Sequence, residues 1–210
     1  YSLLEYHLKR LVSSAEYFGY DADMHNIRKE LATIAADLPP VPTKVRLLVS
    51  RLGKIGWEAV PLALTAQRFR DIVPAQGPID TRDVFLYHKT TRRMVYEEAI
   101  RMCPGYDDVL LFNENGEATE TTIANIAVEI DGQLFTPPVH CGLLPGTLRA
   151  WQLEHAHLRE RVISVQEVLK SPNVYLLNSV RGMHKVHIRD TEDKNMPDKG
   201  VQANATVSRR

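Results

Sequence analysis

The chain has 210 residues, enough for one large or two small domains, and a globule of this size can bury about 70% of its unfolded surface. Its 26 basic residues balance its 26 acidic residues, so no net positive field attracts nucleic acid or anionic lipid. The sequence has no run of about 18 apolar residues that could form a membrane-spanning helix. We therefore expect a globular protein that acts on a small molecule, with neither nucleic acid nor membrane as a partner.

The two cysteines and the start of the chain bear on the compartment. Cys103 and Cys141 are too few for a disulfide framework and lack metal-ligand spacing, so we expect reduced thiols and no metal site. The first residues do not have the pattern of a secretory signal. These features predict a cytoplasmic protein. Because residue 1 is Tyr rather than Met, they also suggest that the natural start is missing.

Helical periodicity followed by two strand-like runs characterises the first part of the chain. The first helix is expected to stop at Gly19, and the second to begin with Asp21 or Asp23 as its N-cap. Two helices before an antiparallel hairpin indicate an α+β arrangement. The predicted elements are helices at Leu4–Phe18 and Asp23–Ala36 and strands at Lys44–Ser50 and Trp57–Leu64.

A short segment rich in Pro and Gly, Ile72–Pro78, is the expected boundary between two lobes. We therefore expect an N-terminal lobe at 1–78, a C-terminal lobe at 79–188, and a polar, mobile tail at 189–210. The predicted elements after the boundary are a strand-like stretch Val84–Tyr87, a helix Arg92–Met102, strands Val109–Phe112, Ile123–Ile130 and Gln133–Thr136, a helix Thr147–Leu158 and a strand Val174–Leu177.

Three segments contain residues suited to catalysis or binding. In the first, Lys89 follows a strand-like stretch and precedes a predicted helix. A lysine at a strand end can reach into a cleft, and a desolvated lysine loses its charge readily enough to form a Schiff base. The alternative for this segment alone is a surface lysine in a basic turn.

The second segment places one carboxylate, Glu120, among hydroxyl groups before a strand that is expected to be buried. A buried glutamate needs a hydrogen-bond partner, and a cofactor's ring nitrogen would be one. The alternative is a solvated turn ahead of a strand. The third segment, Gly142–Arg149, opens a helix whose free N–H groups would bind phosphate well. Its alternative is a plain Pro-Gly turn.

Together with two further segments, these motifs resemble in their order the class IV aminotransferases, most closely the 4-amino-4-deoxychorismate lyase-like branch. The resemblance covers residues 4 to about 186. It rests on His7-Leu8-Lys9-Arg10-Leu11, Lys89-Thr90-Thr91-Arg92-Arg93-Met94-Val95-Tyr96, the run from Glu120 to Asn125, Leu143-Leu144-Pro145-Gly146-Thr147-Leu148-Arg149, and Asn178-Ser179-Val180-Arg181-Gly182-Met183.

The resemblance implies pyridoxal 5'-phosphate as cofactor, with Lys89 as the catalytic Schiff-base lysine. Arg181 is implied to meet a substrate carboxylate, with a surface arginine as the alternative. The other implied cofactor contacts are Arg10, Thr147, Leu148 and Ser179 at the phosphate, Glu120 at the ring nitrogen, and Asn125 closing the run after it.

The resemblance also implies a fold type IV architecture like that of D-amino acid aminotransferase. This is a two-lobed α+β fold with a small N-terminal lobe and a β-barrel-like C-terminal lobe, commonly as a homodimer. The strand that usually precedes the His-x-x-Arg helix is expected to be missing, since only six residues come before His7.

The resemblance implies a lyase of folate biosynthesis that eliminates pyruvate to give 4-aminobenzoate. Two alternatives stay open: an aminotransferase acting on a D- or branched-chain amino acid, and a family member that has lost catalysis. Other enzyme classes are disfavoured, because neither Gly-x-Ser-x-Gly nor a P-loop occurs.

Overall fold

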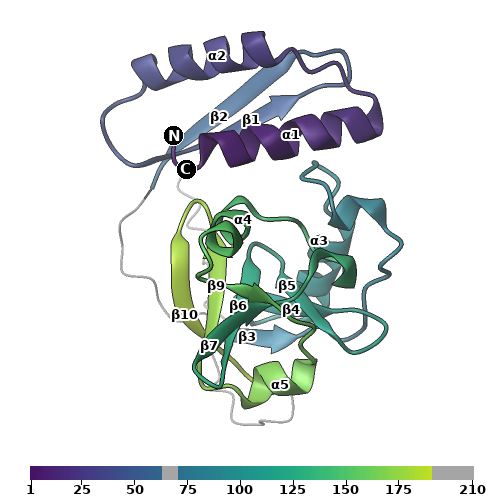
Figure 1. Cartoon of the computed structure of the whole chain (residues 1–210). Helices are drawn as coiled ribbons and strands as arrows, with labels where there is room; N and C mark the ends of the chain where they lie inside the picture. The colour runs from purple at the N-terminus through teal and green to yellow at the C-terminus, as the bar shows by residue number, and fades with distance from the viewer. Residues whose placement is uncertain (63–70, 191–210) are drawn as a thin grey trace, which may run out of the picture.

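The computed structural model describes residues 1–62 and 71–190, which form two sheets with helices packed on them (Figure 1). The smaller unit is a two-stranded antiparallel sheet with two helices. Its elements are α1 (Leu4–Phe18), α2 (Met24–Asp37), β1 (Thr43–Val49) and β2 (Ile55–Pro61). All four predicted elements are confirmed, with ends that differ by a few residues.

Local chemistry explains where the two helices begin and end. Gly19 caps α1 in the left-handed region at φ 65°, a conformation that glycine adopts without strain. Asp23 is the N-cap of α2, because its side chain accepts hydrogen bonds from the backbone N–H groups of His25 and Asn26. Leu8 of α1 is buried with residues of α2 and β1, which joins the elements into one small core.

The larger unit is a closed, mixed barrel of six strands. The hydrogen-bonded order is β5-β4-β3-β10-β9-β6, and pairing of β5 with β6 closes the ring. β3 runs parallel to both of its neighbours, and the other pairs in the ring are antiparallel. The strands are β3 (Asp71–Pro74), β4 (Asp108–Phe112), β5 (Ala118–Thr121), β6 (Asn125–Ile130), β9 (Val174–Asn178) and β10 (Gly182–Ile188), with β7 (Gln133–Thr136) and β8 (Arg159–Glu160) extending the sheet beyond β6. The expected α+β fold with a barrel-like second lobe is confirmed.

Alternating residues of the strands build separate cores. On β3, Ile72 packs with α5 (Val165–Lys170), whereas Val73 packs with α3 (Met94–Met102). On β9, Leu177 packs with α4 (Thr147–Glu154). The alternation therefore gives each helix its own apolar surface, and it leaves α4 on the side of the barrel that faces α1 (Figure 1).

Three expectations from the sequence need correction. The segment Val84–Tyr87 is not a strand; residues 84–86 form a short 3-10 helix, begun by Asp83, whose side chain accepts from the N–H of Phe85. The helix at Thr147 ends at Glu154 rather than Leu158, because Ala156 adopts a positive φ of 56°. The strand expected at 123–130 begins at Asn125.

Four strands were not predicted from the sequence, and one of them moves the lobe boundary. β3 lies in the expected boundary segment Ile72–Pro78, yet it pairs with β4 and β10 in the barrel. The change from the small unit to the barrel therefore comes before β3. The other three are β5, β8 and β10. Most of the predicted tail, residues 191–210, lies outside the described residues, and Arg189 pairs with Asp71 at 2.8 Å.

Candidate active site

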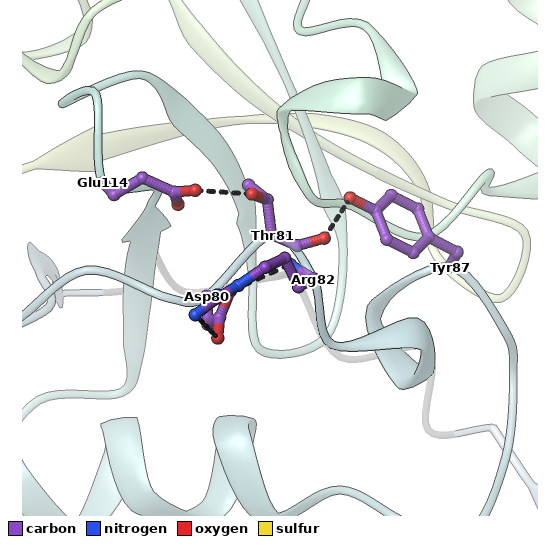
Figure 2. A network of polar contacts seen from close by, with 5 residues as sticks. All are labelled: Asp80, Thr81, Arg82, Tyr87 and Glu114. Carbon is purple, nitrogen blue, oxygen red and sulfur yellow. Dashed lines mark hydrogen bonds and ion pairs between the residues drawn. The ribbon is translucent and has the colours of Figure 1, made fainter.

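The loop that carries Lys89 is fixed by a polar network on its N-terminal side (Figure 2). The Thr81 hydroxyl donates to the Glu114 carboxylate at 2.6 Å, and the Tyr87 hydroxyl donates to the Thr81 carbonyl at 2.7 Å. The network ties the segment after β3 to the turn after β4. It thus restrains the backbone two residues before the lysine.

Helix α1 restrains the same loop from the small unit. Ser14 Oγ lies 3.0 Å from Nδ1 of His88, and the His88 ring stacks on Tyr17 with centroids 4.5 Å apart. Phe18 meets the same imidazole edge-on at 4.9 Å. Since His88 directly precedes Lys89, these contacts place the lysine where the two units meet.

Lys89 itself is accessible to solvent, yet enough protein surrounds its amine to change its acidity. Desolvation is the main cause that lowers the pKa of Lys89 to about 8, and the positive charge of Arg93 adds to it. The negative charge of Glu120 opposes both effects. An accessible amine with a lowered pKa is deprotonated often enough near neutral pH to act as a nucleophile.

Glu120 lies on β5 and is only 4% exposed. Its Oε1 accepts from the Tyr96 hydroxyl at 2.8 Å and from the Leu144 N–H at 3.0 Å, while Oε2 accepts from Asn125 Nδ2 at 3.0 Å. Desolvation nevertheless raises the pKa of Glu120 to about 7, against the opposing effect of the Leu144 and Tyr96 donors and of the Lys89 charge. The interpretation of this segment as a solvated turn is therefore wrong.

Asn125 connects Glu120 to the turn before α4. Its Nδ2 donates to the Leu144 carbonyl at 2.9 Å as well as to Glu120. Gly146 lies so close that a Cβ atom added there would be 1.9 Å from Oδ1 of Asn125. Glycine is therefore required at this position for Asn125 to hold the carboxylate.

The first turn of α4 provides free backbone donors. Gly146 is its N-cap and provides no side-chain hydrogen bond, so within the described residues the N–H groups of Thr147 and Leu148 have no side-chain cap. Arg10 of α1 reaches this turn, where its Nη1 donates to the Pro145 carbonyl at 3.3 Å. A helix start beside an arginine is suited to bind an anion.

His7 lies at the same place, one turn before Arg10 on α1. Its Nε2 is 3.4 Å from the Thr147 hydroxyl. Burial, followed by the charges of Arg10 and Lys89, lowers the pKa of His7 to about 4. His7 is thus neutral at pH 7, and Arg10 is the cation that α1 provides to the turn.

Ser179 and Leu148 line one cavity of about 260 Å³. The cavity also has an apolar wall that includes Leu3 and Trp151. Arg181, by contrast, is exposed: its backbone N–H is bound by the Asn178 side chain at 2.8 Å, and no contact within the described ranges joins its side chain to the other predicted residues. The structure therefore brings together every predicted site residue except Arg181.

Two residues of the site, Tyr96 and Arg93, belong to the lysine motif, but the sequence predicts no role for them. Tyr96 of α3 bonds Glu120, and the guanidinium of Arg93 lies over the Tyr96 ring at 4.4 Å. The sequence signal was only their place in the motif, because the contact joins residues 24 positions apart. The bonds from the Leu144 backbone to Glu120 and Asn125 have no signal in the sequence, whereas the N–H groups of Thr147 and Leu148 were expected from the helix start.

Gly146→Ala tests the packing beside Asn125. The new methyl group would displace the Asn125 side chain and break its bonds to Glu120 and Leu144. We expect a loss of about 1–3 kcal/mol in the free energy of unfolding, measured by urea denaturation. Gly77→Ala is the control, because a Cβ there meets nothing within 4 Å. Equal stability of the two variants would contradict the packing argument.

Glu120→Gln tests the raised pKa of Glu120 through stability. Between pH 4.5 and about 7 the carboxyl ionises in the unfolded chain but stays protonated in the folded protein. Wild type should therefore lose stability relative to the variant as pH rises through this window, by an amount on the order of 1–3 kcal/mol. The opposite trend from His7 cancels in the difference. A difference that does not change with pH would refute the assignment.

Comparison with known proteins identifies the family. The model of the family "Amino-transferase class IV" matches residues 1–188. A Schizosaccharomyces pombe protein named "Putative aminodeoxychorismate lyase" is 30% identical over 192 residues, which cover 87% of this chain and 82% of that protein.

Solved structures agree. A Mesorhizobium loti protein described as a "Putative amino-acid aminotransferase" has a TM-score of 0.81 at 33% identity, covering 89% of this chain and 92% of its own. A "hypothetical aminotransferase" from Mycobacterium tuberculosis, in its PLP-bound form, has a TM-score of 0.75 at 22% identity, covering 89% and 76%. The chain belongs to the class IV aminotransferase family of pyridoxal phosphate-dependent enzymes.

Proposed function

We propose that this protein is a pyridoxal phosphate-dependent lyase of the aminodeoxychorismate type, which eliminates pyruvate and gives 4-aminobenzoate in cytoplasmic folate biosynthesis. The main support is the pairing of an accessible lysine of lowered pKa, Lys89, with a buried glutamate, Glu120, close enough to interact electrostatically. The lysine motif and the name of the S. pombe relative favour the lyase over other reactions of the family.

The residues present fit the proposed cofactor. Its carbonyl needs an amine, which Lys89 offers. Its ring nitrogen needs a buried acceptor, and Oε2 of Glu120, which can accept two hydrogen bonds, has one donor among the described residues. Its phosphate dianion needs N–H donors and a cation, which the start of α4 and Arg10 provide, with Ser179 nearby in the cavity wall.

The protein's part in the reaction follows from these positions. When bound, the cofactor supplies an electron sink for the electrons released at the substrate carbon. Lys89 would hold the cofactor through its amine, and the same amine, when free, would accept a proton from the substrate carbon. Glu120 would keep the ring nitrogen protonated. Arg10 and the backbone of Thr147 and Leu148 would hold the phosphate.

An aminotransferase is the second candidate, acting on a D- or branched-chain amino acid. The M. loti relative, at 33% identity, is described as an amino-acid aminotransferase, which favours this alternative. In that case Lys89 would return the proton to the cofactor instead of promoting elimination. The third candidate is a family member that has lost catalysis. For each catalytic candidate we further propose a homodimer of two-lobed subunits with an amino compound as substrate.

Lys89→Ala tests the cofactor proposal. Wild type mixed with pyridoxal phosphate should gain visible absorbance, and borohydride reduction followed by peptide mapping should place the cofactor on Lys89. The variant should lose this absorbance because it lacks the amine. Lys185→Ala is the control, since Lys185 is exposed on β10 and bonds only Asn173 among the described residues. Labelling of another lysine, or no binding by wild type, would refute the proposal.

Reaction products separate the two catalytic candidates. With aminodeoxychorismate, the loaded enzyme should release pyruvate and 4-aminobenzoate, and Lys89→Ala should reduce the rate by about 10²–10⁴-fold. With D-alanine or a branched-chain amino acid and 2-oxoglutarate, it should form no glutamate. Glutamate without pyruvate would replace the lyase by the aminotransferase. Absence of both products from a cofactor-loaded protein would support the non-catalytic alternative.

A further inference from the structure

The hydrogen bonds of Glu120 are unevenly shared between its two oxygens. A carboxylate oxygen accepts two hydrogen bonds, and Oε1 has both, from the Tyr96 hydroxyl and the Leu144 N–H. Oε2 has one donor, Asn125 Nδ2, within the described part of the chain. The site therefore leaves one acceptor position, and it is on Oε2.

Tyr96 is itself held from the opposite side. The Arg93 guanidinium lies over the Tyr96 ring at 4.4 Å, and its Nη2 donates to the Thr122 carbonyl at 2.5 Å. Thr122 follows β5, the strand that carries Glu120. Arg93 thus links the tyrosine on α3 to the turn beside the glutamate, which restrains the position of the Tyr96 ring.

We propose that Tyr96, held by Arg93, is a positioning residue that stabilises the ionised form of Glu120 and leaves Oε2 as the acceptor for the cofactor's protonated ring nitrogen. The part of this proposal that concerns the cofactor rests on the proposed function. The part that concerns Tyr96 and Glu120 involves the protein alone: a donor to Oε1 stabilises the charged form of the carboxylate and determines which oxygen remains available.

The charges around Glu120 determine the sign of the effect. Its charged neighbours are Lys89 in the loop, Arg93 before α3 and Arg10 on α1, all cations that favour the ionised carboxylate. Burial raises the pKa of Tyr96 far above its ordinary value, so the phenol remains a donor at every working pH. Loss of the Tyr96 hydroxyl removes a donor that stabilises the carboxylate, so it raises the pKa of Glu120 even though the cations remain.

Tyr96→Phe tests this in the protein without cofactor. The variant keeps the ring under Arg93 and loses only the donor. The titration midpoint of Glu120, followed by NMR with carboxyl-¹³C glutamate and assigned with Glu120→Gln, should rise by about one pH unit, a roughly tenfold change in proton affinity. Tyr6→Phe is the matched control, because Tyr6 also donates to a carboxylate, that of exposed Glu154. It should leave the midpoint unchanged.

Arg93→Gln gives a second variant if Tyr96→Phe does not fold. It removes both the stacking on Tyr96 and a nearby cation, and it should raise the Glu120 midpoint as well. An unchanged midpoint in Tyr96→Phe would overturn the proposal, because the Tyr96 hydroxyl would then have no effect on the ionisation of Glu120. A midpoint that shifts in Arg93→Gln but not in Tyr96→Phe would also overturn the proposal, since loss of the Arg93 charge would then explain the shift without the Tyr96 hydroxyl.

The part of the proposal that concerns the cofactor is tested by NMR with pyridoxal phosphate whose ring nitrogen is labelled with ¹⁵N. The ¹⁵N shift should report a protonated ring nitrogen in wild type and in Tyr6→Phe at neutral pH, and a largely unprotonated one in Tyr96→Phe. A protonated nitrogen in all three proteins would overturn this part. Failure of wild type to bind the cofactor would instead refute the proposed function, while the titration without cofactor would still decide whether Tyr96 controls Glu120.

Discussion

The burial of a single carboxylate constrains the whole site. Glu120 is almost fully removed from water, where a charge is costly unless donors surround it. Its donors in the described part of the chain come from α3, from β6 and from the loop before α4. Satisfying this one side chain therefore fixes the relative positions of three elements. The requirement for Gly146 beside Asn125 follows from the same packing.

The site is completed where the small unit meets the barrel. Helix α1 brings Arg10 to the start of α4, and through Ser14 and His88 it restrains the loop of Lys89. Residues separated by more than a hundred positions in the sequence thus share one anion-binding turn. Movement of α1 would displace Arg10 and disturb the lysine loop together, so under the proposed function cofactor binding would depend on the packing of the two units.

Local charge differs sharply from the overall balance. The chain has no net charge, yet Lys89, Arg93 and Arg10 gather around the single carboxylate of Glu120. This excess of cations suits a cofactor that carries a phosphate dianion. The opposed pKa shifts of Lys89, toward the neutral amine, and of Glu120, toward the protonated acid, both arise from desolvation. Bringing an anionic cofactor into the site would change the balance of both groups.

The sequence by itself determined the elements whose signals are local. The α1 periodicity, its Gly19 stop and the Asp23 cap all act within a few residues, so α1 and α2 could be predicted closely. Motif order also identified Lys89 and Glu120 as candidates. Only the tertiary structure decided that β3 belongs to the barrel and that Tyr96 bonds Glu120, because strand pairing and buried hydrogen bonds depend on partners far away in the chain.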